Sequence, residues 1–291
     1  MSATRRPRRT SPILVAVACL MPSSAAAHPG TGIVVDRYGQ VYFVDMVSGV
    51  WKLSARGVLT HIPGPGFHWM GLDADGHFTA TPLPSGSAGD IVRLGTDPTL
   101  LLASDFPIAV GGDGNVYFPS HDGRTPIKIV RLLPSGQRST LASLPAIGSG
   151  APLRDLNGLA AGPDGSLYLT DDASIRRLSR AGLVSTIVAG VAFAGCPSPL
   201  LRGLAVDAGD TVYVAATGCG RVLKVTPAGG ITVVSKSPGT WAPTGVALFG
   251  HTLYVLEFQH PLTDDRREML PRIRTITPDG RAVIIATVTS H

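Results

Sequence analysis

The chain has 291 residues, of which 44% are hydrophobic and 6% aromatic, and it contains 35 glycines and 24 prolines. This length allows one large domain or two small ones, and the apolar fraction is enough for a sizeable core. The formal net charge is +5, but Arg5, Arg6, Arg8 and Arg9 supply most of it and the remainder is close to neutral. The composition excludes the basic footprint of a nucleic-acid-binding protein and favours many short strands joined by turns.

The first 27 residues have the three parts of a secretory signal peptide. The four arginines precede an apolar run over residues 13–21, and small residues follow as far as Ala27. The run is too short to span a bilayer, so we expect cleavage after Ala27 and a periplasmic or secreted protein. Two variants stay open, namely twin-arginine export through the paired arginines and a lipoprotein site ending at Cys19.

Six copies of one unit fill residues 28–291. Each copy contains a turn glycine followed by an alternating strand, usually with a tyrosine, and the copies recur roughly every 40 residues, the spacing of a repeat fold. The turn glycines are Gly39, Gly76, Gly114, Gly165, Gly209 and Gly250. A strand of small residues, such as 32–35 or 158–161, precedes each turn glycine.

Two further strands complete each unit. The third alternates basic and apolar residues and is predicted at 50–53, 91–94, 129–132, 175–178, 222–225 and 273–276. The fourth is predicted at 58–62, 100–103, 139–142, 185–188, 231–234 and 283–287. Four antiparallel strands in six units predict an all-β, six-bladed β-propeller with small first strands around its axis. Because each blade is one contiguous segment, we expect blades 1 and 6 to meet without exchanging a strand.

Two segments carry a family resemblance. NGLAAGPDGSLYLTD (157–171) and GLAVDAGDTVYVA (203–215) resemble NHL repeats. The whole of residues 28–291 is similar to the NHL and SMP-30/gluconolactonase-like group of propellers. The resemblance implies the fold but does not specify the function, because propellers of this kind include lactonases, lyases, esterases and binding modules.

Two cysteines remain after removal of the signal peptide, which carries Cys19. In an oxidising compartment we expect Cys196 and Cys219 to form one disulfide within blade 5.

Ligands of propellers usually meet where the segments ahead of the first strands converge on the axis. The six residues at those places are Thr31, His68, Phe106, Asn157, Arg202 and Thr244. A second ring is expected on the same face, where the second strands end: Asp45, Thr81, Ser120, Asp171, Ala216 and Glu257.

The resemblance to SMP-30-like lactonases implies a divalent ion held by a carboxylate, two asparagines and an aspartate. Only Asn157 matches that set, because Thr31, Phe106 and Arg202 stand at the other positions, and a guanidinium repels a metal ion. We therefore predict no cofactor, with Ca²⁺ or Zn²⁺ at Asn157 as the alternative. Asn157 is interpreted either as a ligand contact or as an Asn-Gly turn residue that satisfies its own backbone.

His68, Arg202 and Glu257 are the candidate catalytic residues. His68 and Arg202, with Asn157, Asp171 and Asp45, are also candidate ligand-binding residues. A histidine can move protons and an arginine suits a carboxylate or phosphate. The plainer alternatives are a stack of His68 on Trp69 and a salt bridge from Arg202 to Asp45 or Asp171.

An insertion over residues 257–272 lengthens one loop of blade 6. Its charged residues Asp264, Asp265, Arg266, Arg267 and Glu268 form either a lid or a solvated surface loop. The loop 144–156 is expected on the same side. No Gly-x-Ser-x-Gly elbow or phosphate-binding glycine loop is present in the sequence.

These residues support two functions. The favoured hypothesis is an exported, monomeric binding module that captures a small molecule or a protein segment at its axial face, without nucleic acid and without a membrane span. The alternative is a hydrolase or lyase of the lactonase-like group whose rearranged centre uses His68, Arg202, Asn157 and Glu257.

Overall fold

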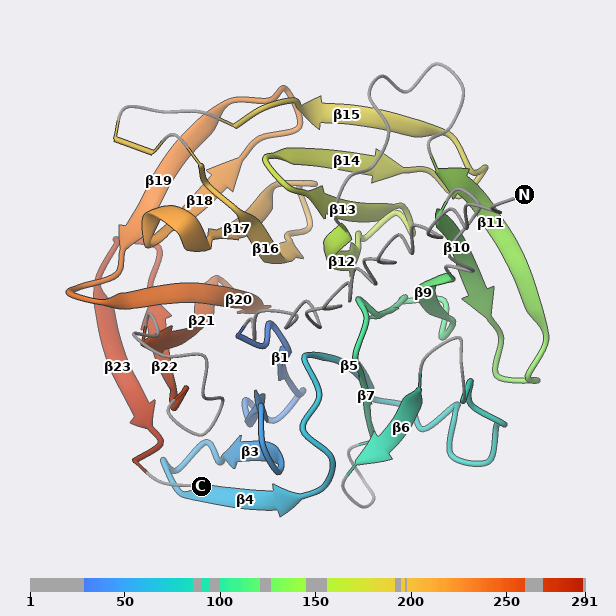
Figure 1. Cartoon of the computed structure of the whole chain (residues 1–291), viewed down its shortest axis with the longest axis horizontal. Helices are drawn as coiled ribbons and strands as arrows, with labels where there is room; N and C mark the ends of the chain where they lie inside the picture. Colours follow the sequence, from blue (N-terminus) through green and yellow to red (C-terminus); the bar gives the residue numbers. More distant parts are fainter. Residues whose placement is uncertain are drawn as a thin grey trace, which may run out of the picture.

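A computed structural model describes residues 29–85, 90–94, 100–120, 127–144, 156–191, 195–196, 198–259 and 269–289. These residues form six antiparallel sheets around a central axis, each sheet built from one contiguous stretch of chain (Figure 1). The fold is therefore the predicted six-bladed β-propeller. The predicted signal peptide, the charged residues 264–268 of the blade 6 insertion and residues 145–155 of the loop before blade 4 lie outside the described residues.

The strands follow the predicted order in five of the six blades. Blade 1 consists of β1 (Ile33–Val35), β2 (Val41–Asp45), β3 (Gly49–Leu53) and β4 (Leu59–Pro63), and blade 2 of β5 (Trp69–Asp73), β6 (Ile91–Leu94) and β7 (Leu100–Ser104). Blade 3 consists of β8 (Ala109–Val110), β9 (Val116–Ser120), β10 (Ile127–Leu132) and β11 (Arg138–Leu144). Blade 4 consists of β12 (Leu156–Ala161), β13 (Leu167–Asp171), β14 (Ser174–Leu178) and β15 (Val184–Val188). Blade 5 consists of β16 (Leu201–Val206), β17 (Val212–Ala216), β18 (Arg221–Val225) and β19 (Ile231–Lys236), and blade 6 of β20 (Trp241–Phe249), β21 (Thr252–Gln259), β22 (Pro271–Ile276) and β23 (Ala282–Thr287).

Blade 2 departs from the prediction. Residues 76–81, the predicted second strand, form turns and bends instead, and β7 takes the place beside β5 in a sheet ordered β5-β7-β6. The segment lacks the valine, leucine and tyrosine residues of the other second strands, and Pro82 and Pro84 follow it without N–H donors. Side chains hold it in place: Asp73 accepts from the Phe78 N–H at 2.7 Å, and Arg93 donates to the Phe78 carbonyl, also at 2.7 Å.

The hydrophobic core lies between the blades. Each second strand is covered on both faces by neighbouring sheets, which is why residues such as Phe43, Leu169 and Val255 are fully buried. One cluster joins Ile33 of blade 1 with Leu256 of blade 6, and β1 packs directly on β20. This contact confirms that the ring closes without strand exchange.

The two faces of the propeller differ. We call the face where first strands begin and second strands end the upper face, and the opposite face, with the turns between first and second strands, the lower face. Near the upper face the first strands touch: a side chain on Gly158 would meet the Arg202 carbonyl at 2.5 Å, and one on Gly203 would lie 2.8 Å from the Gly245 Cα. Toward the lower face they separate around a channel of about 320 Å³, lined by apolar residues such as Val34, Leu72 and Val206.

The predicted disulfide is present. Cys196, ahead of β16, is bonded to Cys219 in the 3₁₀ turn η1 (Thr217–Cys219), and their Cα atoms are 5.5 Å apart. The bond therefore lies within blade 5, as expected. In the part of the chain that the structure describes, no helix is long and apolar enough to cross a membrane.

On the lower face, aspartates in the turns accept hydrogen bonds from the tyrosines of the second strands. These bonds were not predicted from the sequence. Tyr117 donates its hydroxyl to Asp113 at 2.7 Å, and Tyr213 donates to Asp207 at 3.4 Å. Burial and the bond to Asp113 raise the pKa of Tyr117 to about 12. In blade 4 the acceptor belongs to the next blade, because Tyr168 donates to Asp210 at 2.9 Å.

Candidate functional site

Five polar residues of the predicted first ring are buried at the upper end of the axis. They are Thr31, His68, Asn157, Arg202 and Thr244. Arg202 and Asn157 are each only 7% exposed, which is unusual for an arginine. The sixth position, Phe106, stacks on Phe118 within blade 3 with ring centroids 5.8 Å apart.

Hydrogen bonds between blades fix the backbone of this ring. The N–H groups of Thr31 and Gly32 in blade 1 donate to the His68 carbonyl of blade 2, at 2.7 and 2.9 Å. The indole of Trp69 reaches from blade 2 to blade 4, where its Nε1 donates to the Asn157 carbonyl at 3.0 Å. Thr170 of blade 4 donates to the Arg202 carbonyl of blade 5 at 2.8 Å. The side chains of the ring therefore stand on rigid elements.

His68 has a carboxylate partner that the sequence analysis did not identify. Its Nδ1 lies 3.0 Å from Oδ1 of Asp105, whose side chain is 59% exposed. The irregular order of blade 2 brings the two together, because β7, which Asp105 follows, pairs with β5 in the register Trp69↔Ser104. The expected ring contact is also present, with the His68 and Trp69 rings tilted at 49° and their centroids 5.6 Å apart.

Two carboxylates of the predicted second ring make bonds within their own blades. Asp45 accepts from the N–H groups of Val47 and Ser48, at 2.8 and 3.1 Å, and from the Trp51 indole at 2.9 Å. Asp171 forms a buried ion pair with Arg176 of the adjacent strand, at 2.8 Å. Both acids thus tie the second strand of a blade to its third.

Glu257 is held by two arginines. It is fully buried at the end of β21, and its two oxygens bind Arg272 and Arg274 of β22, each at 2.7 Å. Ser237 donates to the same group at 2.5 Å. Arg272 in turn lies over the Trp241 ring, 3.9 Å from its centroid. These contacts give Glu257 a structural role in blade 6, and among the described residues no contact joins Glu257 to His68.

Thr81 does not belong to this face. Its hydroxyl donates to the Pro134 carbonyl at 2.5 Å, in the turn between β10 and β11 on the lower face. The loss of the second strand in blade 2 removes Thr81 from the predicted ring.

The described residues contain no cluster of three or more His, Cys, Asp and Glu side chains that could hold a metal ion. The upper ring instead combines a guanidinium, an amide and a histidine beside a carboxylate. Such a set can bind a carboxylate or phosphate through charge-assisted hydrogen bonds, and a histidine oriented by a carboxylate can also accept a proton.

No protein-family model matches this chain, and no curated protein matches its sequence. Solved structures do match. Virginiamycin B lyase from Staphylococcus aureus aligns over 90% of this chain and 85% of its own, with 17% identity and a TM-score of 0.52. A calcium-binding protein, regucalcin, from Agrobacterium tumefaciens aligns over 82% of this chain and 85% of its own, with 16% identity and a TM-score of 0.53.

A proposed gluconolactonase aligns over 80% of this chain and 89% of its own, with 21% identity and a TM-score of 0.53. The structural neighbours are thus six-bladed propellers of the SMP-30/gluconolactonase-like and lyase kinds, in agreement with the resemblance of the repeats. At these identities the likeness shows the fold alone.

Proposed function

We propose that this protein is an exported propeller that binds a carboxylate-bearing ligand at the centre of its upper face. The observation that carries the proposal is the buried guanidinium of Arg202, placed in β16 at the axis between Asn157 and Thr244 of the neighbouring first strands. A guanidinium offers two parallel N–H donors that match a carboxylate. Asn157 and His68, from two other blades, would orient the remainder of the ligand.

The ring is suited to binding because it is already ordered. Backbone hydrogen bonds between blades hold the residues that carry His68, Asn157 and Arg202, so little conformational freedom is left to lose when a ligand arrives. The acids Asp171 and Glu257 are paired with arginines of their own blades. The disulfide Cys196–Cys219 supports the exported location, where such bonds persist.

Calorimetric titration with citrate, gluconate and succinate tests this proposal. We expect at least one of these anions to bind the protein, and Arg202→Gln to weaken that binding about tenfold or more, the usual effect of losing a hydrogen bond to a charged group. Arg202→Lys keeps the charge but not the paired donors, and we expect an intermediate affinity.

Arg56→Gln is the matched control, because Arg56 is exposed in the turn between β3 and β4. It should bind like the unmodified protein. Thermal melting of each variant confirms that it is folded. Absence of binding by all three anions, or an affinity unchanged in Arg202→Gln, would show that the proposal is wrong.

One observation favours a second candidate, a hydrolase or lyase. His68 Nδ1 lies 3.0 Å from Asp105, the arrangement in which a carboxylate orients a histidine that acts as general base. Two of the structural neighbours, a lyase and a proposed gluconolactonase, are named for activities of this class. If this candidate holds, turnover of a lactone or ester panel should disappear in His68→Gln and fall in Asp105→Asn, whereas citrate binding should persist in Asp105→Asn.

A further inference from the structure

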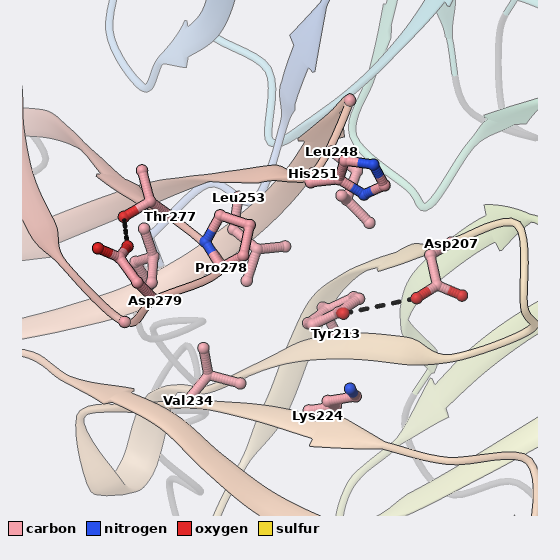
Figure 2. A pocket seen from close by; sticks show the side chains of 13 residues that line it. Asp207, Tyr213, Lys224, Val234, Leu248, His251, Leu253, Thr277, Pro278 and Asp279 are labelled. Carbon is pink, nitrogen blue, oxygen red and sulfur yellow. Dashed lines mark hydrogen bonds between the residues drawn. The ribbon is translucent and has the colours of Figure 1, made fainter.

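A second pocket lies on the lower face, in the wedge between blades 5 and 6 (Figure 2). Its volume is about 550 Å³, within the usual range for small-molecule sites. Blade 5 contributes Asp207, Tyr213, Lys224 and Val234, and blade 6 contributes Leu248, His251, Leu253 and the segment from Ile276 to Gly280. It lies on the face opposite the ring that contains Arg202, and the proposed function does not use it.

The wedge between blades 4 and 5 is closed at the same position by a hydrogen bond between the two blades. There Tyr168 donates to Asp210 of the next blade at 2.9 Å. Arg177, which faces Tyr168 across the strand pair, forms an ion pair with Asp164 at 2.6 Å. Tyrosine, cation and carboxylate thus satisfy one another across the gap between the two blades.

The wedge between blades 5 and 6 has a tyrosine and a cation at the equivalent positions, but it remains open. Tyr213 faces Lys224 across the strand pair, as Tyr168 faces Arg177. The turn between β20 and β21 consists of Gly250 and His251 and supplies no carboxylate, and Tyr213 donates to Asp207 of its own blade at 3.4 Å. Lys224 is half-buried, and its side chain forms no ion pair or hydrogen bond with any of the described residues.

The carboxylates near Lys224 are engaged elsewhere. Asp207 accepts from the N–H groups of Gly209 and Thr211, at 2.8 and 2.9 Å, as well as from Tyr213. Asp279 is exposed and accepts the hydroxyl of Thr277 at the far end of the pocket (Figure 2). Among the described residues, neither of these two carboxylates forms an ion pair with Lys224, which presents its ammonium group to the pocket.

The remainder of the pocket wall is apolar. Leu248, Leu253 and Pro278 lie along its blade 6 side in Figure 2, and Val234 lies on the blade 5 side near Lys224. We propose that this wedge is a binding site for a small carboxylate with an apolar body, such as a medium-chain or aryl-substituted acid. The carboxylate binds Lys224 with Tyr213 beside it, and the apolar body covers the leucines.

This geometry requires both parts of the ligand. A charge without an apolar body leaves the leucines in contact with water, and an apolar body without a charge leaves the half-buried ammonium without a counter-ion. Burial, followed by the nearby charge of Asp207, raises the pKa of Tyr213. The phenol thus keeps its proton and its bond to Asp207 at neutral pH, and adds no negative charge beside the ligand.

Titration calorimetry of the full chain with octanoate and 4-phenylbutyrate tests the proposal, with octanamide and acetate as probes that each lack one part. We expect octanoate or 4-phenylbutyrate to bind and the two partial probes to bind at least about tenfold more weakly. Lys224→Met removes the charge at similar length and should weaken octanoate binding about tenfold or more, whereas Lys224→Arg should retain it.

Lys52→Met is the matched control. Lys52 occupies the same place in blade 1, where its ammonium lies over the Tyr42 ring, 5.5 Å from the centroid, so its loss should leave octanoate binding unchanged. Arg202→Gln should also leave it unchanged, which separates this site from the upper ring. The proposal is overturned if neither acid binds, if octanamide binds as tightly as octanoate, if Lys224→Met has no effect, or if Arg202→Gln abolishes the binding.

Discussion

Glu257 and its two arginines show how single residues hold this propeller together. The carboxylate is fully buried, and it makes ion pairs of 2.7 Å with both Arg272 and Arg274. Asp171 with Arg176 and Asp45 with Trp51 connect the same two strands in other blades. These polar groups beneath the upper face therefore act within a blade, whereas the residues that we propose to bind a ligand stand at the axis.

We expect Glu257→Gln to destabilise the protein by about 3–5 kcal/mol, because it leaves two buried arginines without their counter-ion. Asp164→Asn is the control, since the Asp164–Arg177 pair is 43% and 38% exposed and such pairs contribute at most about 1 kcal/mol. Urea-induced unfolding of the two variants measures the difference. Equal losses in both variants would contradict the structural role of Glu257.

The tyrosines predict an alkaline limit to stability. Burial and the bond to Asp113 raise the pKa of Tyr117 to about 12, and burial followed by the bond to Asp210 raises that of Tyr168. The folded state thus holds these protons more tightly than the unfolded state, in which the value is about 10. The contribution of these protonated tyrosines to the free energy of unfolding is complete below pH 10 and is lost as the pH rises toward 12.

Melting temperatures from pH 8 to pH 12 should therefore fall steeply above about pH 10, and less steeply in Tyr117→Phe. Tyrosinate absorbance provides a second measurement: the folded protein should ionise part of its six tyrosines at higher pH than the chain unfolded in urea. If the melting temperatures of Tyr117→Phe and the unmodified protein fall equally between pH 10 and pH 12, the Asp113–Tyr117 bond does not contribute to this loss of stability.

At the scale of strands, the glycines of the first strands set how closely the blades approach the axis. A Cβ atom on Gly245 would overlap the Thr31 carbonyl of the neighbouring blade and meet Ile33 at 3.0 Å. Because backbone on both sides is fixed by sheet hydrogen bonds, the clash cannot be relieved by a side-chain rotation.

We expect Gly245→Ala to cost about 1–3 kcal/mol through overpacking, which corresponds to a fall in melting temperature of a few degrees or more. Gly112→Ala is the control, because nothing lies within 4 Å of the added Cβ there. Calorimetric melting distinguishes the two variants. A melting temperature unchanged in Gly245→Ala would show that the first strands can move apart.

The elements also show what the sequence can and cannot predict. Five blades were predictable because each second strand pairs a turn glycine with an alternating tyrosine strand, and the six residues at the axis followed from that repeat. Blade 2 was not, since the pairing of β7 with β5 depends on a competition between strands that are distant in sequence. Asp105 was missed for the same reason: only the exchanged order of blade 2 places it next to His68.

At the scale of the whole molecule, the propeller has two faces of different chemistry. The upper face closes over tightly packed glycines and carries Arg202, Asn157 and His68, whereas the lower face opens into the axial channel and the wedge that contains Lys224. The repeat pattern predicted the ring on the upper face. The wedge was not predictable, because it depends on how blades 5 and 6 meet and on the hydrogen bonds that occupy Asp207.

The most direct test of the central claim compares anions with metal ions in one melting experiment. A ligand that binds only the folded protein raises its melting temperature by mass action. Citrate, gluconate and succinate are compared with Ca²⁺, Zn²⁺, Mg²⁺ and a chelator. We predict that at least one anion raises the melting temperature in an Arg202-dependent manner and that the metal ions and the chelator leave it unchanged. A rise with Ca²⁺ or Zn²⁺ that the chelator reverses, without a response to any anion, would contradict the account and identify a metal-dependent centre instead.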